Sequence, residues 1–366
     1  QSLGAAGAFV GIVAGAMYAV RLLVGTPVGR MADRRGILWV LRLSLALYPL
    51  VALAYWAAGS IPALIGARLL HGLASAMMLP MAMAYMGQVS PPGREGQYMG
   101  IYNTVILFAS GLGPQAATLI ASRYGMRSTY FVLLILAGAA LVIVLLLRPE
   151  SPKAGKTPVE TAKVPFNLWL RNPALLALGC VYIGQAVLMS LIGFFFILYP
   201  PTKGIGLIYT GAMIAVYNLL CGFIQIPLGR MTDRADKCLL ISLAGLGITV
   251  ELVLFPLLIG VWIMIAAMGV LAVTSALLMI ASSALAAIVG RREGMGRTMG
   301  FLGTANSVGM ILGSLVLSLI PGRFGLDSIF YLAGFVVLAS TIVFKVYWRF
   351  DISGVIEEEV KHGHNV

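Results

Sequence analysis

Gly29-Arg30-Met31-Ala32-Asp33-Arg34-Arg35-Gly36 is a charged turn between two long apolar runs, and the chain repeats it. The second copy, Gly229-Arg230-Met231-Thr232-Asp233-Arg234, stands two hundred residues later, and a proline precedes each copy at the same distance. The offset then persists without a gap, since Gly96, Met99, Gly100 and Thr104 recur as Gly296, Met299, Gly300 and Thr304. Two similar halves are therefore joined in tandem.

The composition is that of a membrane protein. Of the 366 residues, 60% are hydrophobic and 10% are charged, and the mean hydropathy is +0.96. A soluble globule with these proportions would lack the polar residues that cover its surface. The net charge of +12 does not indicate nucleic-acid binding, because the basic residues sit in short turns between apolar runs. The three cysteines, Cys180, Cys221 and Cys238, lack metal-ligand spacing, so we expect small buried side chains and no metal site.

Eleven apolar runs are long enough for transmembrane helices, because a bilayer core needs about 20 apolar residues of helix. The turns near residues 60 and 258 are so short that each joins a helical hairpin. The sequence therefore predicts an all-α polytopic membrane protein. Its spans are expected near residues 4–28, 37–59, 61–88, 97–121, 128–148, 171–198, 205–228, 238–257, 259–289, 296–321 and 327–348.

The loop charges predict the orientation of the chain, because cytoplasmic loops retain Lys and Arg during insertion. Eighteen basic residues fall on the side of the repeated turn, against four on the other side, Arg123, Arg127, Lys203 and Arg323. We therefore expect the repeated turn and the C-terminus in the cytoplasm. The expected location is a prokaryotic cytoplasmic (inner) membrane.

The expected domains follow the repeat. Residues 1–148 form an N-terminal helical bundle and residues 171–348 a C-terminal six-helix bundle, with a cytoplasmic tail at 349–366. The connecting stretch, 149–170, is rich in Pro, Lys, Glu and Thr and cannot bury enough apolar area to fold alone, which predicts a cytoplasmic linker.

The repeat also predicts a helix that precedes residue 1. Subtracting 200 from the span at 171–198 places its counterpart before the chain begins. We therefore expect a twelve-span protein of which eleven transmembrane helices are present. A natural eleven-span protein is the alternative.

The pattern Gly-x-x-x-Asp-Arg-x-Gly at 29–36 resembles the signature loop of the major facilitator superfamily. The resemblance runs from residue 1 to about 348. It includes an Arg-x-x-x-Gly pattern at Arg68 and Gly72 and a Gly-x-Arg-x-x-Tyr-Phe pattern at 125–131. It implies two six-helix bundles around a central cavity that opens to alternate sides of the membrane.

In this family the signature loop packs across the interface of the halves. The resemblance implies that Asp33 faces the start of the span near Gly296, and that Asp233 faces the start of the span near Gly96. A carboxylate suits the partly positive N-terminus of a helix, and glycine permits a close approach. A basic turn that only anchors the orientation is the alternative. The expected gating residues are Gly29, Asp33, Arg34, Gly229, Asp233 and Arg234.

The second copy of the loop departs from the pattern, since Asp236 stands where the first copy has Gly36. The span at 97–121 partly resembles an antiporter signature: Gly111, Gly113 and Pro114 match it, whereas Ala116 and Ala117 replace its last two glycines. Close packing and a kink at Pro114 favour export. A kinked packing helix in a carrier of either direction is the alternative.

Ionisable residues inside a bilayer cost several kcal/mol and are functional candidates. Arg68 and His71 lie one turn apart on a span that lines the cavity in the family, where Arg68 matches an arginine linked to proton coupling. Arg21 fits either cavity lining or a side chain that reaches toward the membrane surface. Glu251 is the only carboxylate in the interior of an expected span, and we expect it to face lipid because its helix is peripheral in the family.

Uncharged residues on the expected cavity helices complete the candidate solute and proton pathway. Each of them is also explained by a hydrogen bond between helices. Together with many methionines they predict a large, adaptable and mostly apolar pocket. They are Asn103, Gln185, Phe194, Tyr217, Asn218, Ser275, Met279 and Asn306.

The sequence thus predicts a secondary active transporter of a small organic solute, amphiphilic or drug-like, that works by alternating access as a proton-coupled efflux antiporter. The expected partners are the solute, protons and the lipid bilayer, without nucleic acid, and we expect a monomer. No nucleotide-binding loop or catalytic arrangement is visible, so we expect no enzyme and no cofactor. An importer or facilitator of a sugar or organic anion, and a non-transporting receptor on the same fold, are the alternatives.

Overall fold

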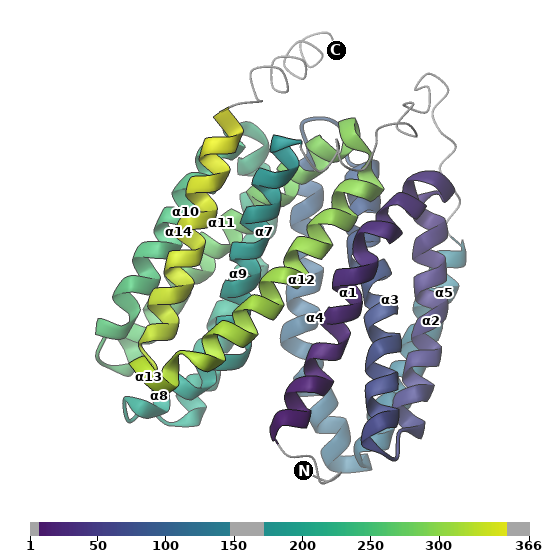
Figure 1. Ribbon diagram of the computed structural model, residues 1–366, viewed down its shortest axis with the longest axis horizontal. Coiled ribbons are helices and arrows are strands. Elements are labelled where there is room, and N and C mark those ends of the chain that lie inside the picture. Colours follow the sequence, from purple (N-terminus) through teal and green to yellow (C-terminus); the bar gives the residue numbers. More distant parts are fainter. Residues whose placement is uncertain (1–6, 147–171, 350–366) are drawn as a thin grey trace. The chain divides into compact units, whose positions relative to one another are not determined.

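The computed structural model describes residues 7–146 and 172–349, and every regular element in these two ranges is helical (Figure 1). The all-α fold class is therefore confirmed. The first range holds α1 (Gly7–Arg35), α2 (Ile37–Ala57), α3 (Ile61–Val89), α4 (Glu95–Tyr124) and α5 (Met126–Leu146). The second holds α7 (Pro173–Ser190), α8 (Tyr199–Thr202), α9 (Leu207–Arg234), α10 (Lys237–Leu254), α11 (Val261–Glu293), α12 (Met295–Leu319), α13 (Pro321–Phe324) and α14 (Ser328–Arg349).

Ten helices within the described ranges are long and apolar enough to cross a membrane. The remaining long helix, α1, covers the described part of the first expected span, 7–28. The expected linker, 149–170, and the expected tail, 349–366, lie outside the described residues except for residue 349, the last of α14. One expected span ends early, because a proline starts the separate short helix α13 at Pro321 after α12 ends at Leu319.

The expected span at 171–198 is one continuous α-helix only as far as Ser190. Asn172 caps α7, since its side-chain oxygen accepts hydrogen bonds from the amides of Ala174 and Leu175 at 3.0 and 3.4 Å. A π-helical turn over Leu191–Phe195 and a 3₁₀ turn over Phe196–Leu198 then lead into α8. The helix therefore changes its winding at the end that precedes α8.

The two copies of the charged turn reverse the chain by different means. Gly36 adopts a φ of 94°, a backbone conformation that residues with a Cβ rarely adopt. Asp236 has a φ of −66° and caps α10, since its carboxylate accepts a hydrogen bond from the amide of Cys238 at 2.8 Å. The departure of the second copy from the glycine pattern is thus an exchange of a glycine turn for an N-cap.

The chain forms two compact units. Among the described residues, unit 1 comprises 7–85, 112–146 and 290–307, and unit 2 comprises 86–111, 172–289 and 308–349. Each unit consists mainly of one repeat but takes in the first part of a helix from the other, because α12 begins in unit 1 and α4 in unit 2. The division into bundles at 1–148 and 171–348 stays a prediction.

Within unit 1, α2 packs against α1 and α5 (Figure 1). The core here includes Val51, Tyr55, Ala67 and Ala74, all of which are buried. Within unit 2, α14 packs against both α7 and α10. Gly245 of α10 lies against Thr341 of α14 so closely that a Cβ at this position would overlap the threonine hydroxyl.

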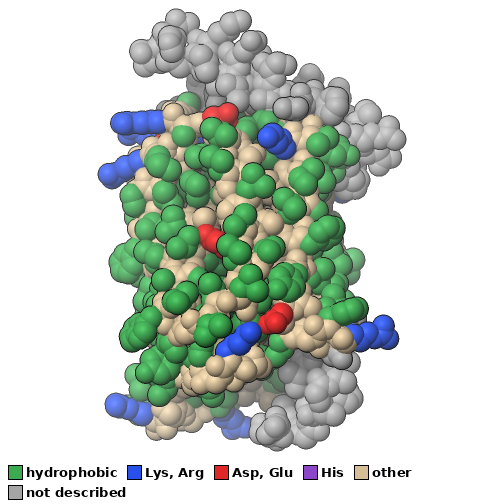
Figure 2. Space-filling view, turned by 90° about the vertical axis from the view of Figure 1, so that its left-hand side faces the viewer, with side chains coloured by type: hydrophobic (Ala, Val, Ile, Leu, Met, Phe, Trp, Pro, Cys, Tyr) green, Lys and Arg blue, Asp and Glu red, His purple; other side chains and the backbone are tan. Residues whose placement is uncertain are grey.

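Large apolar side chains are exposed along the outward faces of the helices. On α10, for example, Leu239, Leu243 and Val250 are each more than half exposed. Figure 2 shows one face of the molecule, on which hydrophobic side chains cover the middle while Lys and Arg lie mainly toward the two ends. Apolar faces of this extent are those that contact the hydrocarbon of a bilayer.

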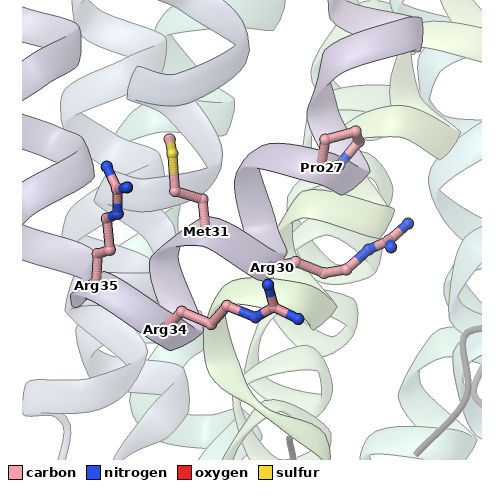
Figure 3. Close-up of a pocket in the computed structure, with 5 residues that line it drawn as sticks. All are labelled: Pro27, Arg30, Met31, Arg34 and Arg35. Atoms are coloured by element: carbon pink, nitrogen blue, oxygen red, sulfur yellow. The ribbon is translucent and has the colours of Figure 1, made fainter.

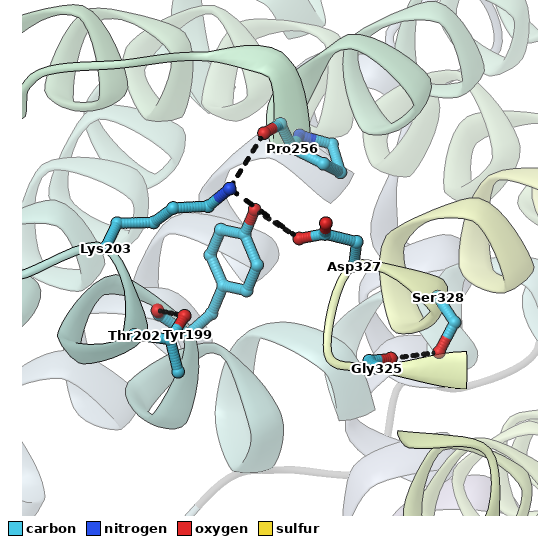
Figure 4. Close-up of polar contacts among 7 residues, drawn as sticks. All are labelled: Tyr199, Thr202, Lys203, Pro256, Gly325, Asp327 and Ser328. Carbon is cyan, nitrogen blue, oxygen red and sulfur yellow. Dashed lines mark hydrogen bonds and ion pairs between the residues drawn. The ribbon is translucent and has the colours of Figure 1, made fainter. Parts of the chain in front are cut away.

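A polar network joins three turns of unit 2 (Figure 4). The buried Tyr199 of α8 donates a hydrogen bond to Oδ1 of Asp327 at 2.8 Å, just before α14 begins. Lys203 donates to the carbonyl of Pro256 at 3.3 Å and forms an ion pair with Asp327 at 3.9 Å. The turns after α8, α10 and α13 are thereby held together.

Candidate functional site

The first signature contact joins Asp33, in the last turn of α1, to the N-terminus of α12. The carboxylate accepts hydrogen bonds from the amides of Gly296 at 2.7 Å and Arg297 at 3.0 Å. The Arg297 guanidinium lies 3.5 Å from the same carboxylate, whose side chain is only 13% exposed. Amides at a helix N-terminus and a nearby cation both stabilise a carboxylate, the helix end by about 0.3–2 kcal/mol.

The second signature contact repeats this geometry in unit 2. Asp233 of α9 accepts hydrogen bonds from the amides of Gly96 at 2.6 Å and Gln97 at 3.0 Å, at the N-terminus of α4. Both contacts that the resemblance implies are therefore present. The exchange of Gly36 for Asp236 does not remove the second one, because Asp236 caps the following helix instead.

Glycines permit the close helix approach at both contacts. A Cβ on Gly29 would overlap the carbonyl oxygen of Gly296, and one on Gly229 would overlap that of Gly96. In unit 1 the approach continues along the helices, since a Cβ on Gly300 would lie 2.7 Å from the carbonyl oxygen of Gly25. The backbones touch directly, so a side chain at these positions has no room.

Three arginines near the end of α1, the helix that carries Asp33, line a hollow. Pro27, Arg30, Met31, Arg34 and Arg35 line an open hollow of about 380 Å³ (Figure 3). Arg34 is exposed, and so is Arg234 of the second copy. The Arg35 guanidinium lies over the ring of Trp39 at 4.9 Å. The gating role of Arg34 and Arg234 stays a prediction.

Arg68, His71 and Arg21 come together in unit 1 in what we call the tyrosine–arginine cluster, which also contains Tyr48, Tyr55 and Tyr130. The Arg68 guanidinium lies over the ring of Tyr55 at 5.7 Å. The Tyr55 hydroxyl lies 3.2 Å from Nδ1 of His71, and the Tyr55 ring stacks on Tyr130 at 5.4 Å. Helices α1, α2, α3 and α5 all contribute to the cluster.

The cluster is cationic and incompletely satisfied. Nε of Arg68 is buried and has no hydrogen-bond partner within the described ranges. Arg21 is 9% exposed, and both arginines act electrostatically on His71. A buried guanidinium atom without a partner favours a ligand with a hydrogen-bond acceptor or a negative charge. The aromatic rings beside it suit an apolar body.

The predicted pathway residues in unit 2 are largely engaged with one another or with neighbouring helices. The Asn103 amide donates hydrogen bonds to Gln225 at 3.4 Å and to Ser283 at 3.3 Å. The Gln225 amide nitrogen lies 3.6 Å from the sulfur of Met279. Gln185 donates to Ser282 at 2.8 Å. Hydrogen bonds between helices therefore account for these side chains, and their role in the pathway stays a prediction.

The other predicted pathway residues belong to both units. Tyr217 is fully buried and lies beside Ser275. Asn218 donates to the carbonyl of Ile214 on its own helix at 3.0 Å. Phe194 is 48% exposed in the π-helical turn after α7, and Asn306 is half-buried on α12 in unit 1.

The antiporter-like stretch lies in α4. Gly113 is exposed, and nothing lies within 4 Å of the position that a Cβ would take there. The helix continues through Pro114, whose side chain lies outside the described residues. Close packing at Gly113 is thus not seen within its unit, and the kink stays a prediction.

Sequence reasoning missed the three tyrosines of the cluster and Gln225. Tyr48 and Tyr55 are seven residues apart, which is two helical turns, so they share a face of α2. That spacing was a signal for a polar stripe on an otherwise apolar helix. Gln225 is an amide within an expected span, which is the same kind of signal that singled out Gln185.

Comparison with known proteins identifies the family. A relative from Methanocaldococcus jannaschii, described as an uncharacterized MFS-type transporter, is 23% identical over 343 residues, which are 90% of this chain and 86% of the relative. A multi-drug resistance efflux pump PmrA homolog from Lactococcus lactis is 24% identical and covers 96% of this chain and 87% of its own length. The crystal structure of the human organic anion transporter MFSD10 matches with a TM-score of 0.79 at 17% identity, over 91% of this chain and 83% of that one.

The family model agrees with the geometry of the repeated turn. The model of the Major Facilitator Superfamily matches residues 1–235 and 203–361. The two matches overlap and together extend over both repeats. The chain belongs to the Major Facilitator Superfamily of membrane transporters.

Proposed function

We propose that this chain is a secondary active transporter that exports small amphiphilic, drug-like organic solutes by alternating access in exchange for protons. The tyrosine–arginine cluster carries the proposal, because it combines stacked aromatic rings with a buried Arg68 nitrogen that has no hydrogen-bond partner within the described ranges. An amphiphile offers an apolar body for such rings and a polar group for such a nitrogen. The similarity to the PmrA homolog, a multi-drug efflux pump, supports export.

Protons are proposed as the coupling ion because of His71. Histidine is the side chain that changes its charge most readily near neutral pH. The Tyr55 hydroxyl 3.2 Å from Nδ1 holds its ring in place, and the two arginines lie within electrostatic reach. Protonation of His71 and binding of an anionic or acceptor group at Arg68 would therefore influence each other.

The two signature contacts are the proposed gating elements. Each joins a helix end of one repeat to a helix start of the other, and each consists of a carboxylate with two backbone amides. Such contacts form and break as units, which suits a protein that alternates between two states. We further propose that the chain acts as a monomer in a prokaryotic inner membrane, with these turns and the C-terminus in the cytoplasm.

A second candidate is a carrier of organic anions without a fixed outward direction. The cationic character of the cluster favours it, and MFSD10, which shares the fold, is described as an organic anion transporter. The two candidates differ in direction and coupling rather than in the site.

Transport into liposomes with imposed pH gradients separates the two candidates. An exchanger accumulates solute when the lumen is acidic, because protons leave as solute enters, and an importer coupled to protons accumulates solute when the outside is acidic. A gradient of one pH unit supports at most about a tenfold accumulation per proton. We expect accumulation with an acidic lumen for amphiphiles in a panel of anionic, neutral and cationic members. Accumulation of anions independent of the pH gradient would favour the second candidate.

A further inference from the structure

Glu251 is a carboxylate inside an apolar helix, remote in sequence from the residues of the tyrosine–arginine cluster. It lies in the candidate membrane span Lys237–Leu257, and its neighbours Val250 and Val253 are 56% and 42% exposed. Glu251 itself is half-buried, and the Thr274 hydroxyl of α11 donates a hydrogen bond to its Oε2 at 3.0 Å. The side chain is thus held at the seam of α10 and α11 rather than directed wholly into lipid.

The other repeat shows that this position does not need a carboxylate for folding. The residues two hundred positions earlier are Val51, in place of Glu251, and Ala74, in place of Thr274. Both are fully buried in the core of unit 1. At this position α2 and α3 pack with two apolar residues, whereas the corresponding helices α10 and α11 pack with an acid and its hydroxyl partner.

Among the residues that the structure describes, none supplies a compensating cation to Glu251. Within the described ranges no Lys or Arg pairs with it, and on the neighbouring helices α9, α11 and α14 the titratable group that feels its charge is Tyr217 of α9. A charge inside a membrane costs several kcal/mol, and binding of a proton removes that cost. A carboxylate in this place therefore has reason to exchange a proton.

Thr274 can satisfy both protonation states of the carboxyl group. Its single hydroxyl proton lies within reach of Glu251 and also of the carbonyl oxygens of Val270 at 3.2 Å and Leu271 at 3.1 Å. When Glu251 is charged, the hydroxyl donates to the carboxylate. When Glu251 is protonated, its own O–H can donate to the threonine oxygen while the hydroxyl turns to a carbonyl.

We propose that Glu251 and Thr274 form a second proton-binding site, in unit 2, that exchanges its proton during transport. The coupling part of this proposal rests on the proposed proton-driven function. The binding part does not, because it concerns only whether this carboxyl group takes up a proton within the membrane.

Reaction with a hydrophobic carbodiimide tests the binding part. Such reagents enter bilayers and modify protonated carboxyl groups there. We use the full chain in phosphatidylcholine liposomes, dicyclohexylcarbodiimide as the probe, and peptide mass analysis to locate the label. We expect label on Glu251 that decreases as the pH is raised, and no label at position 251 in Glu251→Gln. Asp327 lies at a turn and its side chain is 49% exposed, so Asp327→Asn is the control and should leave the label on Glu251 unchanged. The absence of label on Glu251 at every pH, or label that does not change with pH, would overturn the proposal.

Transport by the same variants tests the coupling part. Glu251→Gln, and Glu251→Val, which restores the residue of the first repeat, should keep solute exchange without a gradient. Both should lose the part of the accumulation that this second proton drives, so that the limiting ratio of lumenal to external solute falls about tenfold per pH unit relative to the wild type. If the wild type is driven by the gradient and Glu251→Gln is driven equally, this proposal is wrong and the proposed function stands. If the wild type is not driven by any gradient, the proposed function fails, and the pH dependence of the label still decides whether Glu251 binds a proton.

Discussion

Asp33 accepts a hydrogen bond from the backbone amide of Gly296 at 2.7 Å, although the two residues are 263 positions apart in the chain. The contact joins the end of α1 to the start of α12, and Asp233 makes the corresponding contact with Gly96. A repeated turn has thus become a pair of equivalent contacts between helix ends.

Replacing these carboxylates should weaken both contacts, and the first one more. Asparagine keeps the shape of the side chain but loses the charge and turns an amide donor toward backbone donors. We expect Asp33→Asn to lower the free energy of unfolding by about 1–3 kcal/mol. Asp233→Asn should have a smaller effect, because Asp33 also lies 3.5 Å from the Arg297 guanidinium. Thermal unfolding in detergent gives the ranking.

The same variants test the gating role. In a background without Cys180, Cys221 and Cys238, a cysteine at the half-buried Asn306 should react faster with a thiol reagent when Asp33 is replaced. An unchanged reaction rate together with full transport would mean that the contact supports the fold and does not gate.

Glycine at the signature contacts should not tolerate alanine. A Cβ on Gly29 or Gly229 would overlap a backbone oxygen of the facing helix, which cannot move aside as a flexible side chain can. We expect Gly29→Ala and Gly229→Ala to destabilise the protein by about 1–3 kcal/mol. Gly66→Ala is the matched control on α3, because nothing lies within 4 Å of its Cβ position and alanine favours helix by about 1 kcal/mol. Equal melting temperatures for Gly29→Ala and Gly66→Ala would contradict the close approach.

Arg68 should be needed for solute binding through its shape as well as its charge. We expect Arg68→Ala to abolish the binding of amphiphiles that carry an acceptor or anionic group. Arg68→Lys should bind more weakly than the wild type, because lysine keeps the charge but not the planar group over the Tyr55 ring. Equilibrium binding of a radiolabelled solute measures this, with the exposed Arg123→Ala as control. Equal affinity in Arg68→Ala and Arg123→Ala would remove the cluster from the site.

The orientation can be tested with an impermeant thiol reagent on intact cells. Ser60 and Arg323 are exposed and lie in turns that the loop charges predict to be outside the cell. Single cysteines at these two positions should therefore react from outside. A cysteine at the exposed Arg94 should react only after the cells are opened. The reverse pattern would invert the topology that the loop charges predict.

Much of the fold follows from the sequence because a long apolar run in a bilayer satisfies its backbone hydrogen bonds by forming a helix. The run at 37–59 becomes α2 and the run at 61–88 becomes α3, with boundaries that differ by one or two residues. The π-helical turn at 191–195 was not predictable, since local winding depends on packing against other helices and leaves no period in the sequence. Likewise, the sequence pattern presents Asp236 only as a departure from glycine, whereas in the structure it is the N-cap of α10.

The candidate site was predicted only in part. Arg68 and His71 stood out because ionisable residues are rare in apolar spans. The tyrosines around them did not, because a tyrosine is equally at home in a core, at a membrane surface or in a site, and only tertiary contacts distinguish these places. Glu251 was expected to face lipid, whereas the structure holds it half-buried at the Thr274 hydroxyl.

Solute-evoked proton movement across liposomes tests the central claim most directly. With the purified chain in liposomes that contain a pH-sensitive dye, adding an amphiphilic solute outside should raise the lumenal pH as solute enters and protons leave. Arg68→Ala should abolish the signal, and Arg123→Ala should retain it. Proton movement in the wild type that depends on the solute and on Arg68 is the predicted result. Solute flux without proton movement, or proton movement that Arg68→Ala leaves intact, would contradict the account.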